Sequence, residues 1–223
     1  PNFSFMDSPF NLEYYKEDNR QVVFRFICDD PAGEEHIDIP EWLYRKIDGD
    51  GTMYSIDYGR GFSPNYSNPV FIEEHAEAIA ALGEYFGDDD FFIYVELGSL
   101  GHWGEWHVNY EKGITRIPEY AIRQDYIRPY LDAFPNAMFL LRYPLIDAAQ
   151  NGFGLYNDMT GDYDETLYWL EQMKGGVWEQ TELPEQAVCI DTWKTHPIGG
   201  EFASTYDNHH FMVNDFDLTF ESI

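Results

Sequence analysis

One stretch of the chain, residues 91–107 (FFIYVELGSLGHWGEWH), combines the residue types that sugar chemistry needs. An apolar run of strand character, 91–97, leads into a glycine-punctuated loop in which Glu105 lies between Trp103 and Trp106. Aromatic faces can stack on sugar rings, and partial burial raises the pKa of a carboxyl group toward the value that a general acid requires. The pattern predicts a general acid at Glu105 with two tryptophan platforms. The alternative is a tight turn whose tryptophans fill the core.

The composition limits the classes of protein and of binding partner that are compatible with this chain. The chain has 223 residues, of which 44% are hydrophobic and 18% aromatic, which suits one folded domain with a sizeable core. With 13 basic and 41 acidic residues the net charge is −28. Such a field repels phosphate backbones and anionic lipids, so we expect no nucleic acid or membrane partner, whereas neutral sugars are unaffected. Surface acidity for solubility accounts for the charge by itself and is the favoured explanation.

Two cysteines, Cys28 and Cys189, lie in apolar runs and are expected to be buried strand residues. Their number and spacing indicate neither a disulfide framework nor a metal site. No apolar run approaches the roughly 20 residues of a membrane span. We therefore expect no metal and no cofactor.

Strand and helix patterns alternate along the chain. Helices are expected in the second half of 2–20, at 40–47, through Ile72–Phe86, at 118–134 and at 164–173, and a long loop is expected at 48–69. Strands are expected at 21–28, 91–97, 137–143, 152–157 and 197–202. This alternation predicts an α/β fold with parallel strands, whose functional side chains gather at the carboxyl ends of the strands.

Polar residues lie on the expected strands or just after them, and we take these as candidates for substrate binding or catalysis: Arg25, Glu105, Arg142, Asn157, Asp158 and Glu201. Glu201, after two glycines, is a candidate nucleophile or base, or else a member of a structural ion pair. Glu96 and Arg25 lie on neighbouring expected strands, and a structural pair between them is favoured over a catalytic role. His102 and His107 flank the loop and are candidates for hydrogen bonds to sugar hydroxyls. Their spacing does not match the His-Glu-x-x-His pattern of a zinc site.

Two sets of residues carry a resemblance to known glycosidases. RQVVFRFICDD followed by IDIPEWLY resembles the third-strand region of β-galactosidases, where an arginine-bearing strand leads to an acidic loop and a Pro-x-Trp-Leu segment. The elements YVELGSLGHWGEWH, LLRYP, GLYNDM and PIGGEF, in that order, resemble a bacterial family of glycoside-hydrolase-like TIM-barrel proteins of unknown function.

The resemblance implies a (β/α)8 TIM barrel, present here only in part, with strands three to seven at the five expected positions. It implies one domain over 1–223, truncated at both ends. The retaining glycosidases of this type place the acid/base after strand four and the nucleophile on strand seven. Glu105 and Glu201 would then be the catalytic pair.

The leading functional hypothesis is a retaining or inverting glycoside hydrolase that cleaves a neutral glycan by carboxylate chemistry. The alternatives are a non-catalytic carbohydrate-binding barrel and a structural domain of a larger secreted protein. The sequence leaves the localisation open, and these hypotheses are compatible with a place outside the cell or at the cell surface.

Overall fold

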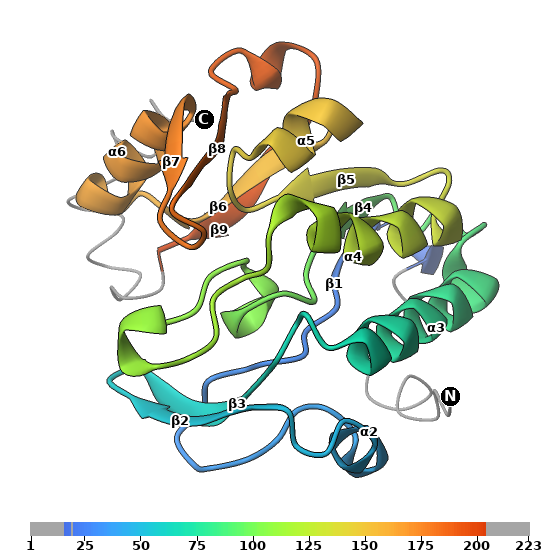
Figure 1. Cartoon of the computed structure of the whole chain (residues 1–223). Coiled ribbons are helices and arrows are strands. Elements are labelled where there is room, and N and C mark those ends of the chain that lie inside the picture. The colour runs from blue at the N-terminus through green and yellow to red at the C-terminus, as the bar shows by residue number, and fades with distance from the viewer. Residues whose placement is uncertain (1–15, 19, 204–223) are drawn as a thin grey trace. The chain divides into compact units, whose positions relative to one another are not determined.

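The computed structural model describes residues 16–18 and 20–203, which belong to two compact units, unit 1 (1–138) and unit 2 (139–223) (Figure 1). Unit 1 contains, in chain order, β1 (Val23–Arg25), α2 (Glu41–Lys46), β2 (Gly51–Ile56), β3 (Gly59–Pro64), α3 (Pro69–Phe86), β4 (Tyr94–Glu96), the short 3-10 helices η2 (His102–Gly104) and η3 (Tyr110–Lys112), and α4 (Tyr120–Ala133). β5 (Met138–Leu141) begins at the last residue of unit 1. Unit 2 continues with α5 (Ile146–Asn151), β6 (Gly154–Thr160), α6 (Tyr163–Gln172), β7 (Lys174–Trp178), β8 (Leu183–Val188), η4 (Thr192–Lys194) and β9 (Ile198–Phe202).

The five expected strands are present as β1, β4, β5, β6 and β9, and their hydrogen-bonded order is β1-β4-β5-β6-β9. β1 pairs with β4, β5 with β6, and β6 with β9, each time in parallel. The mixed α/β class and the parallel pairing are thus confirmed.

The predicted (β/α)8 TIM barrel is wrong. β1 and β9 stand at the two ends of the strand order, and each pairs with a single strand among the described residues. Closing a barrel requires the last strand to pair with the first, so these strands form an open sheet. Alternating strands and helices build open parallel sheets as well as barrels, which is why the pattern could not distinguish them.

The expected long loop at 48–69 is also wrong, because this segment forms the antiparallel hairpin β2–β3. Ile56 pairs with Gly59, so a two-residue turn, Asp57-Tyr58, joins the strands. The segment was predicted as a loop because it is rich in Gly, Asp and Asn. It forms strands because Tyr54 and Phe62 are buried in the core. In unit 2, α5 and the β7–β8 hairpin were likewise not predicted.

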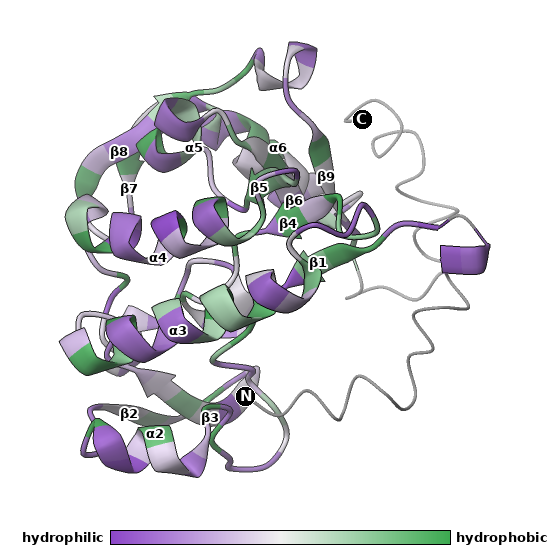
Figure 2. Ribbon diagram, turned by 90° about the vertical axis from the view of Figure 1, so that its right-hand side faces the viewer, coloured by the Kyte–Doolittle hydropathy of each residue, from purple (hydrophilic) through white to green (hydrophobic). Residues whose placement is uncertain are grey.

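α3 confirms the clearest helix prediction and shows why it forms. The Asn68 side chain caps its start by accepting hydrogen bonds from the N–H groups of Val70 and Phe71. Its buried residues recur at a spacing of three or four: Phe71, His75, Ile79, Leu82 and Phe86. The ribbon of α3 accordingly carries both hydrophilic and hydrophobic residues (Figure 2). The helices expected at 40–47, 118–134 and 164–173 are confirmed as α2, α4 and α6. The helix expected in the second half of 2–20 falls mostly outside the described residues.

Within the described part of the chain, no helix combines the length and apolar character needed to cross a membrane.

A buried histidine links α3 to the segment after β4. His75 is 3% exposed, and its Nε2 lies 2.7 Å from the Ser99 hydroxyl, which lies 2.6 Å from the Tyr130 hydroxyl. Burial lowers the pKa of His75 to about 3, so the imidazole is neutral near pH 7.

Because the folded-state pKa of His75 lies below the unfolded value of 6.5, its contribution to stability is complete above about pH 6.5 and is lost as the pH falls toward 3. We expect each pH unit in this window to lower the free energy of unfolding by up to about 1.4 kcal/mol. His75→Gln keeps a polar group near Ser99 but cannot titrate. Urea unfolding at pH 7 and 5 should show a smaller pH effect in this variant than in the wild type. Equal effects would contradict the assignment.

Candidate functional site

The loop at 98–107 is fixed onto the segment that follows β1. The Ser99 N–H donates to the Phe26 carbonyl at 2.6 Å, and the Trp103 N–H donates to the Asp29 carbonyl at 2.7 Å. The buried Asp29 carboxylate accepts from the Tyr54 hydroxyl at 2.5 Å and lies 3.0 Å from Nδ1 of His102. Hydrogen bonds from both backbone and side chains therefore hold the loop rigidly.

The backbone of this loop is strained at three positions. Ser99, Trp103 and Trp106 have φ angles of 70°, 53° and 59°, and they are three of the five non-glycine residues with positive φ in the described chain. Each such residue costs on the order of 1–3 kcal/mol and persists only where the surroundings enforce it, often at functional sites. At Gly98, a Cβ atom would lie 2.1 Å from the Phe26 carbonyl oxygen, so no side chain fits there. The loop therefore has one specific conformation, maintained against local strain.

Two carboxylates meet one guanidinium at the end of β4. Arg25 and Glu96 are partners in the β1–β4 register, and Nε of Arg25 donates to Glu96 Oε2 at 2.7 Å. Nη1 of Arg25 donates to Glu105 Oε1 at 3.0 Å. The predicted Glu96–Arg25 pair is confirmed, and the loop brings Glu105 to the same cation. Glu105 is therefore ion-paired as a carboxylate.

The aromatic and histidine side chains of the loop differ in accessibility. Trp106 is 1% exposed and donates from its indole to the Leu97 carbonyl at 2.7 Å, so it packs in the core and offers no stacking face. His102 is also buried, whereas Trp103 and His107 are partly exposed, with ring centroids 6.0 Å apart. Of the two tryptophans predicted as platforms, only Trp103 can contact a ligand.

Two residues near Trp103 were not predicted. Tyr58, in the turn of the β2–β3 hairpin, is 43% exposed, and its ring centroid lies 5.3 Å from that of Trp103. Burial, followed by the Asp29 charge, raises the pKa of Tyr58 to about 12. Asp30 accepts a hydrogen bond from the Trp103 side chain, and burial and the Asp38 charge raise the pKa of its carboxyl group. Tyr58 was missed because its hairpin was read as loop, although the Asp29-Asp30 pair directly after a strand was a visible signal.

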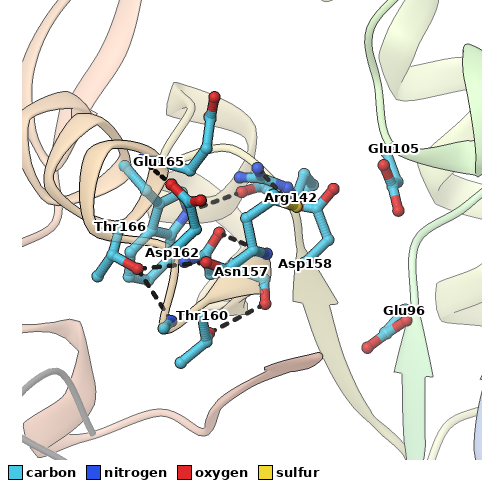
Figure 3. Close-up of polar contacts among 12 residues, drawn as sticks. Glu96, Glu105, Arg142, Asn157, Asp158, Thr160, Asp162, Glu165 and Thr166 are labelled. Atoms are coloured by element: carbon cyan, nitrogen blue, oxygen red, sulfur yellow. Dashed lines mark hydrogen bonds and ion pairs between the residues drawn. The ribbon is translucent and has the colours of Figure 1, made fainter. Parts of the chain in front are cut away.

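Unit 2 holds the remaining predicted residues, of which Arg142, Asn157 and Asp158 are labelled in Figure 3. Arg142, which follows β5, forms an ion pair with Asp158 on β6. Asn157 is 3% exposed, and its Oδ1 accepts the Met159 N–H at 3.2 Å. Glu201 lies on β9, whose residues are all exposed, and it lines a cavity together with Asn157. The structure thus joins Arg142 to Asp158 by an ion pair and places Asn157 and Glu201 in the lining of one cavity.

The connection from β6 to α6 is held by side chains near these pairs (Figure 3). The Thr166 hydroxyl accepts the Gly161 N–H at 3.1 Å and donates to the Met159 carbonyl at 3.2 Å. Asp162 caps α6 by accepting the Glu165 N–H at 3.0 Å. Burial, followed by the Asp162 charge, raises the pKa of the Glu165 carboxyl group.

The two predicted catalytic carboxylates, Glu105 and Glu201, belong to different units, and neither unit alone contains the pair. Among residues 16–18 and 20–203, no group of three or more His, Cys, Asp or Glu side chains is arranged to hold a metal ion. Comparisons of the chain with protein-family models, curated proteins and solved structures give no match. The predicted family resemblance therefore stays a prediction, and function is inferred from geometry.

Replacing Gly98 by Ala should lower the free energy of unfolding by at least about 2 kcal/mol, because the methyl group collides with a backbone oxygen. Gly33→Ala is the matched control, since a Cβ there meets no atom within 4 Å, and it should change stability by less than about 0.5 kcal/mol. Urea unfolding followed by tryptophan fluorescence measures both. Equal stability of the two variants would show that the loop backbone can shift to accommodate a methyl group at position 98, contrary to the prediction.

Proposed function

We propose that unit 1 binds a neutral carbohydrate at the loop 98–107. The observation that carries this proposal is the platform formed by Tyr58 and Trp103, whose rings lie 5.3 Å apart at an interplanar angle of 36°, within the loop region that also holds the ion-paired Glu105. Aromatic side chains supply rigid apolar area, and a few fixed polar groups supply orientation, which is the usual composition of a small-molecule site.

The polar part of the site is pre-organised. The side chains of Arg25 and Glu105 are 13% and 8% exposed, so water reaches only a small part of the cluster. Their positions are set by the β1–β4 register and by the strained loop, which lowers the entropy lost when a ligand binds. Hydroxyl groups can donate to carboxylates and accept from a guanidinium, so a sugar matches both kinds of group.

The charge of the chain favours an uncharged ligand here. The net charge is −28, which repels anionic ligands. In unit 1 the guanidinium of Arg25 forms ion pairs with both Glu96 and Glu105. The negative charge of these two carboxylates is therefore already partly compensated, and a cationic ligand would gain little there.

Trp103→Ala should weaken binding of a neutral oligosaccharide by at least about tenfold, equivalent to about 1.4 kcal/mol, because a stacking face is removed. Trp42→Ala is the control, since Trp42 is 56% exposed on α2 and belongs to no part of the loop. Isothermal titration calorimetry on ligands first selected from a glycan array gives both affinities. Absence of any neutral ligand, or equal affinities of the two variants, would refute the proposal.

Glycoside hydrolysis is a second candidate, favoured by two carboxyl groups whose environments differ. Glu105 is held as a carboxylate by Arg25, the form that a nucleophile or base needs. Asp30, hydrogen-bonded to Trp103, has a raised pKa, which is the direction that an acid needs. This candidate gives Glu105 the role of base or nucleophile, in place of the acid role expected from the sequence.

If the chain hydrolyses glycosides, Glu105→Gln should lower kcat by about 10²–10⁴-fold while sugar binding persists. Asp30→Asn should impair natural glycosides more than aryl glycosides with good leaving groups, which need little protonation. Glu111→Gln, an exposed change outside the loop, should leave turnover unchanged. Turnover of Glu105→Gln at the wild-type rate, with folding checked by circular dichroism, would exclude this mechanism without affecting the binding proposal.

A further inference from the structure

Unit 1 contains a small cavity beside α3 that includes no residue of the loop 98–107. Its volume is about 110 Å³, and its walls come from the segment after β1, from the start of α2 and from α3, which are labelled in Figure 1. The lining residues of α3 recur at helical spacing, so they share one face of the helix: Phe71, Glu74, His75 and Ala78. Ile27 and Trp42 also line the cavity and are 40% and 56% exposed, so a small molecule can enter it from solvent.

The His75 side chain, which lines this cavity, has one nitrogen without a partner. His75 is 3% exposed, and its Nε2 lies 2.7 Å from the Ser99 hydroxyl. Its Nδ1 is buried and has no hydrogen-bond partner in the portion of the chain that the structure describes. The two nitrogens of an imidazole ring point in divergent directions, so Nδ1 is turned away from Ser99. A buried polar atom without a partner costs free energy, which a ligand recovers by making the missing hydrogen bond.

The two carboxylates that line the cavity already have partners. Asp38 accepts the Asp30 N–H at 2.9 Å, and Glu74 forms an ion pair with Lys46. Their charge and the net charge of −28 disfavour an anionic ligand. A cation would have to leave water for a largely apolar cavity whose carboxylates are already paired. The cavity therefore suits an uncharged ligand.

The missing hydrogen bond is one that a hydroxyl group can make. Burial lowers the pKa of His75 to about 3, so near pH 7 its ring is neutral and carries one N–H and one bare nitrogen. The hydroxyls of Ser99 and Tyr130, which lie 2.6 Å apart, can each donate or accept, so they are compatible with either tautomer. A ligand hydroxyl can likewise donate to Nδ1 or accept from it, whereas a carbonyl or an ammonium group matches one tautomer alone.

The walls and the size of the cavity suit one aromatic ring. Phe26, Phe71 and Trp42 line it, and aromatic rings attract one another in edge-to-face and offset arrangements. An apolar cavity of roughly 150 Å³ binds benzene. The present cavity is smaller but open to solvent, so part of a single ring can extend into its mouth.

We propose that this cavity binds a small neutral phenol. The ring packs against Phe26, Phe71 and Trp42, and the hydroxyl group forms a hydrogen bond with Nδ1 of His75. The proposal does not depend on the function proposed for the loop 98–107.

Phenol and toluene are suitable probes, because they have the same shape and differ in a hydroxyl and a methyl group. Toluene is the more apolar of the two and would bind more tightly if burial alone set the affinity. We expect phenol to bind the full chain at least about threefold more tightly than toluene, because it supplies the missing hydrogen bond. His75→Phe keeps an aromatic ring without a nitrogen and should reverse this order. NMR chemical shifts of the backbone amides, followed during titration near pH 7, give the affinities.

A second pair of variants locates the site without changing His75. Ala78→Leu enlarges a lining residue and should weaken binding of both probes by at least about tenfold. Ala80→Leu makes the same change at an exposed position of α3 outside the cavity and should leave both affinities unchanged.

The proposal is overturned if phenol does not bind, if it binds no more tightly than toluene, or if Ala78→Leu and Ala80→Leu bind it equally well. Loss of phenol binding in Trp103→Ala would also overturn it, since the phenol would then occupy the loop. A failure of carbohydrate binding at the loop would instead appear as equal affinities of Trp42→Ala and Trp103→Ala for neutral oligosaccharides.

Discussion

The shared guanidinium of Arg25 is the interaction on which unit 1 depends. The parallel register of β1 and β4 places Arg25 opposite Glu96, and the loop after β4 returns Glu105 to the same group. Charges this deeply placed need partners, because removing one partner of a buried ion pair typically costs several kcal/mol. The path of the loop is therefore dictated by the need to bring a second carboxylate to one cation.

The strain of the loop follows from that requirement. Only seven residues separate Leu97 from Glu105, and the chain must turn back within them. Glycine at 98 allows the backbone to touch Phe26, and positive φ angles at Ser99, Trp103 and Trp106 complete the reversal. The opposing stabilisation comes from hydrogen bonds to Phe26 and Asp29 and from burial of the Trp106 indole. The buried indole of Trp106 thus anchors the loop that carries Trp103.

The parts that the sequence predicted are those with strong local signals. Apolar runs located all five parallel strands, and the spacing along α3 located that helix, because burial on one or both faces leaves a periodic trace. The β2–β3 hairpin was not predicted because Gly, Asp and Asn have low strand propensities. Burial of Tyr54 and Phe62 outweighs these low propensities. Sheet closure left no trace, since it depends on long-range pairing. The same holds for the site: Glu105 and Trp103 were recognisable, but the contact with Tyr58 joins segments 45 residues apart in sequence.

Each unit contains an arginine that is ion-paired with a carboxylate on a neighbouring strand. In unit 1 the cation lies inside the cluster, between Glu96 and Glu105, so that a ligand meets groups that are already paired. In unit 2 Arg142, which follows β5, forms its ion pair with Asp158 on β6. The neutral ligand that we propose for unit 1 therefore needs to bring no charge of its own, because the guanidinium of Arg25 already compensates both carboxylates.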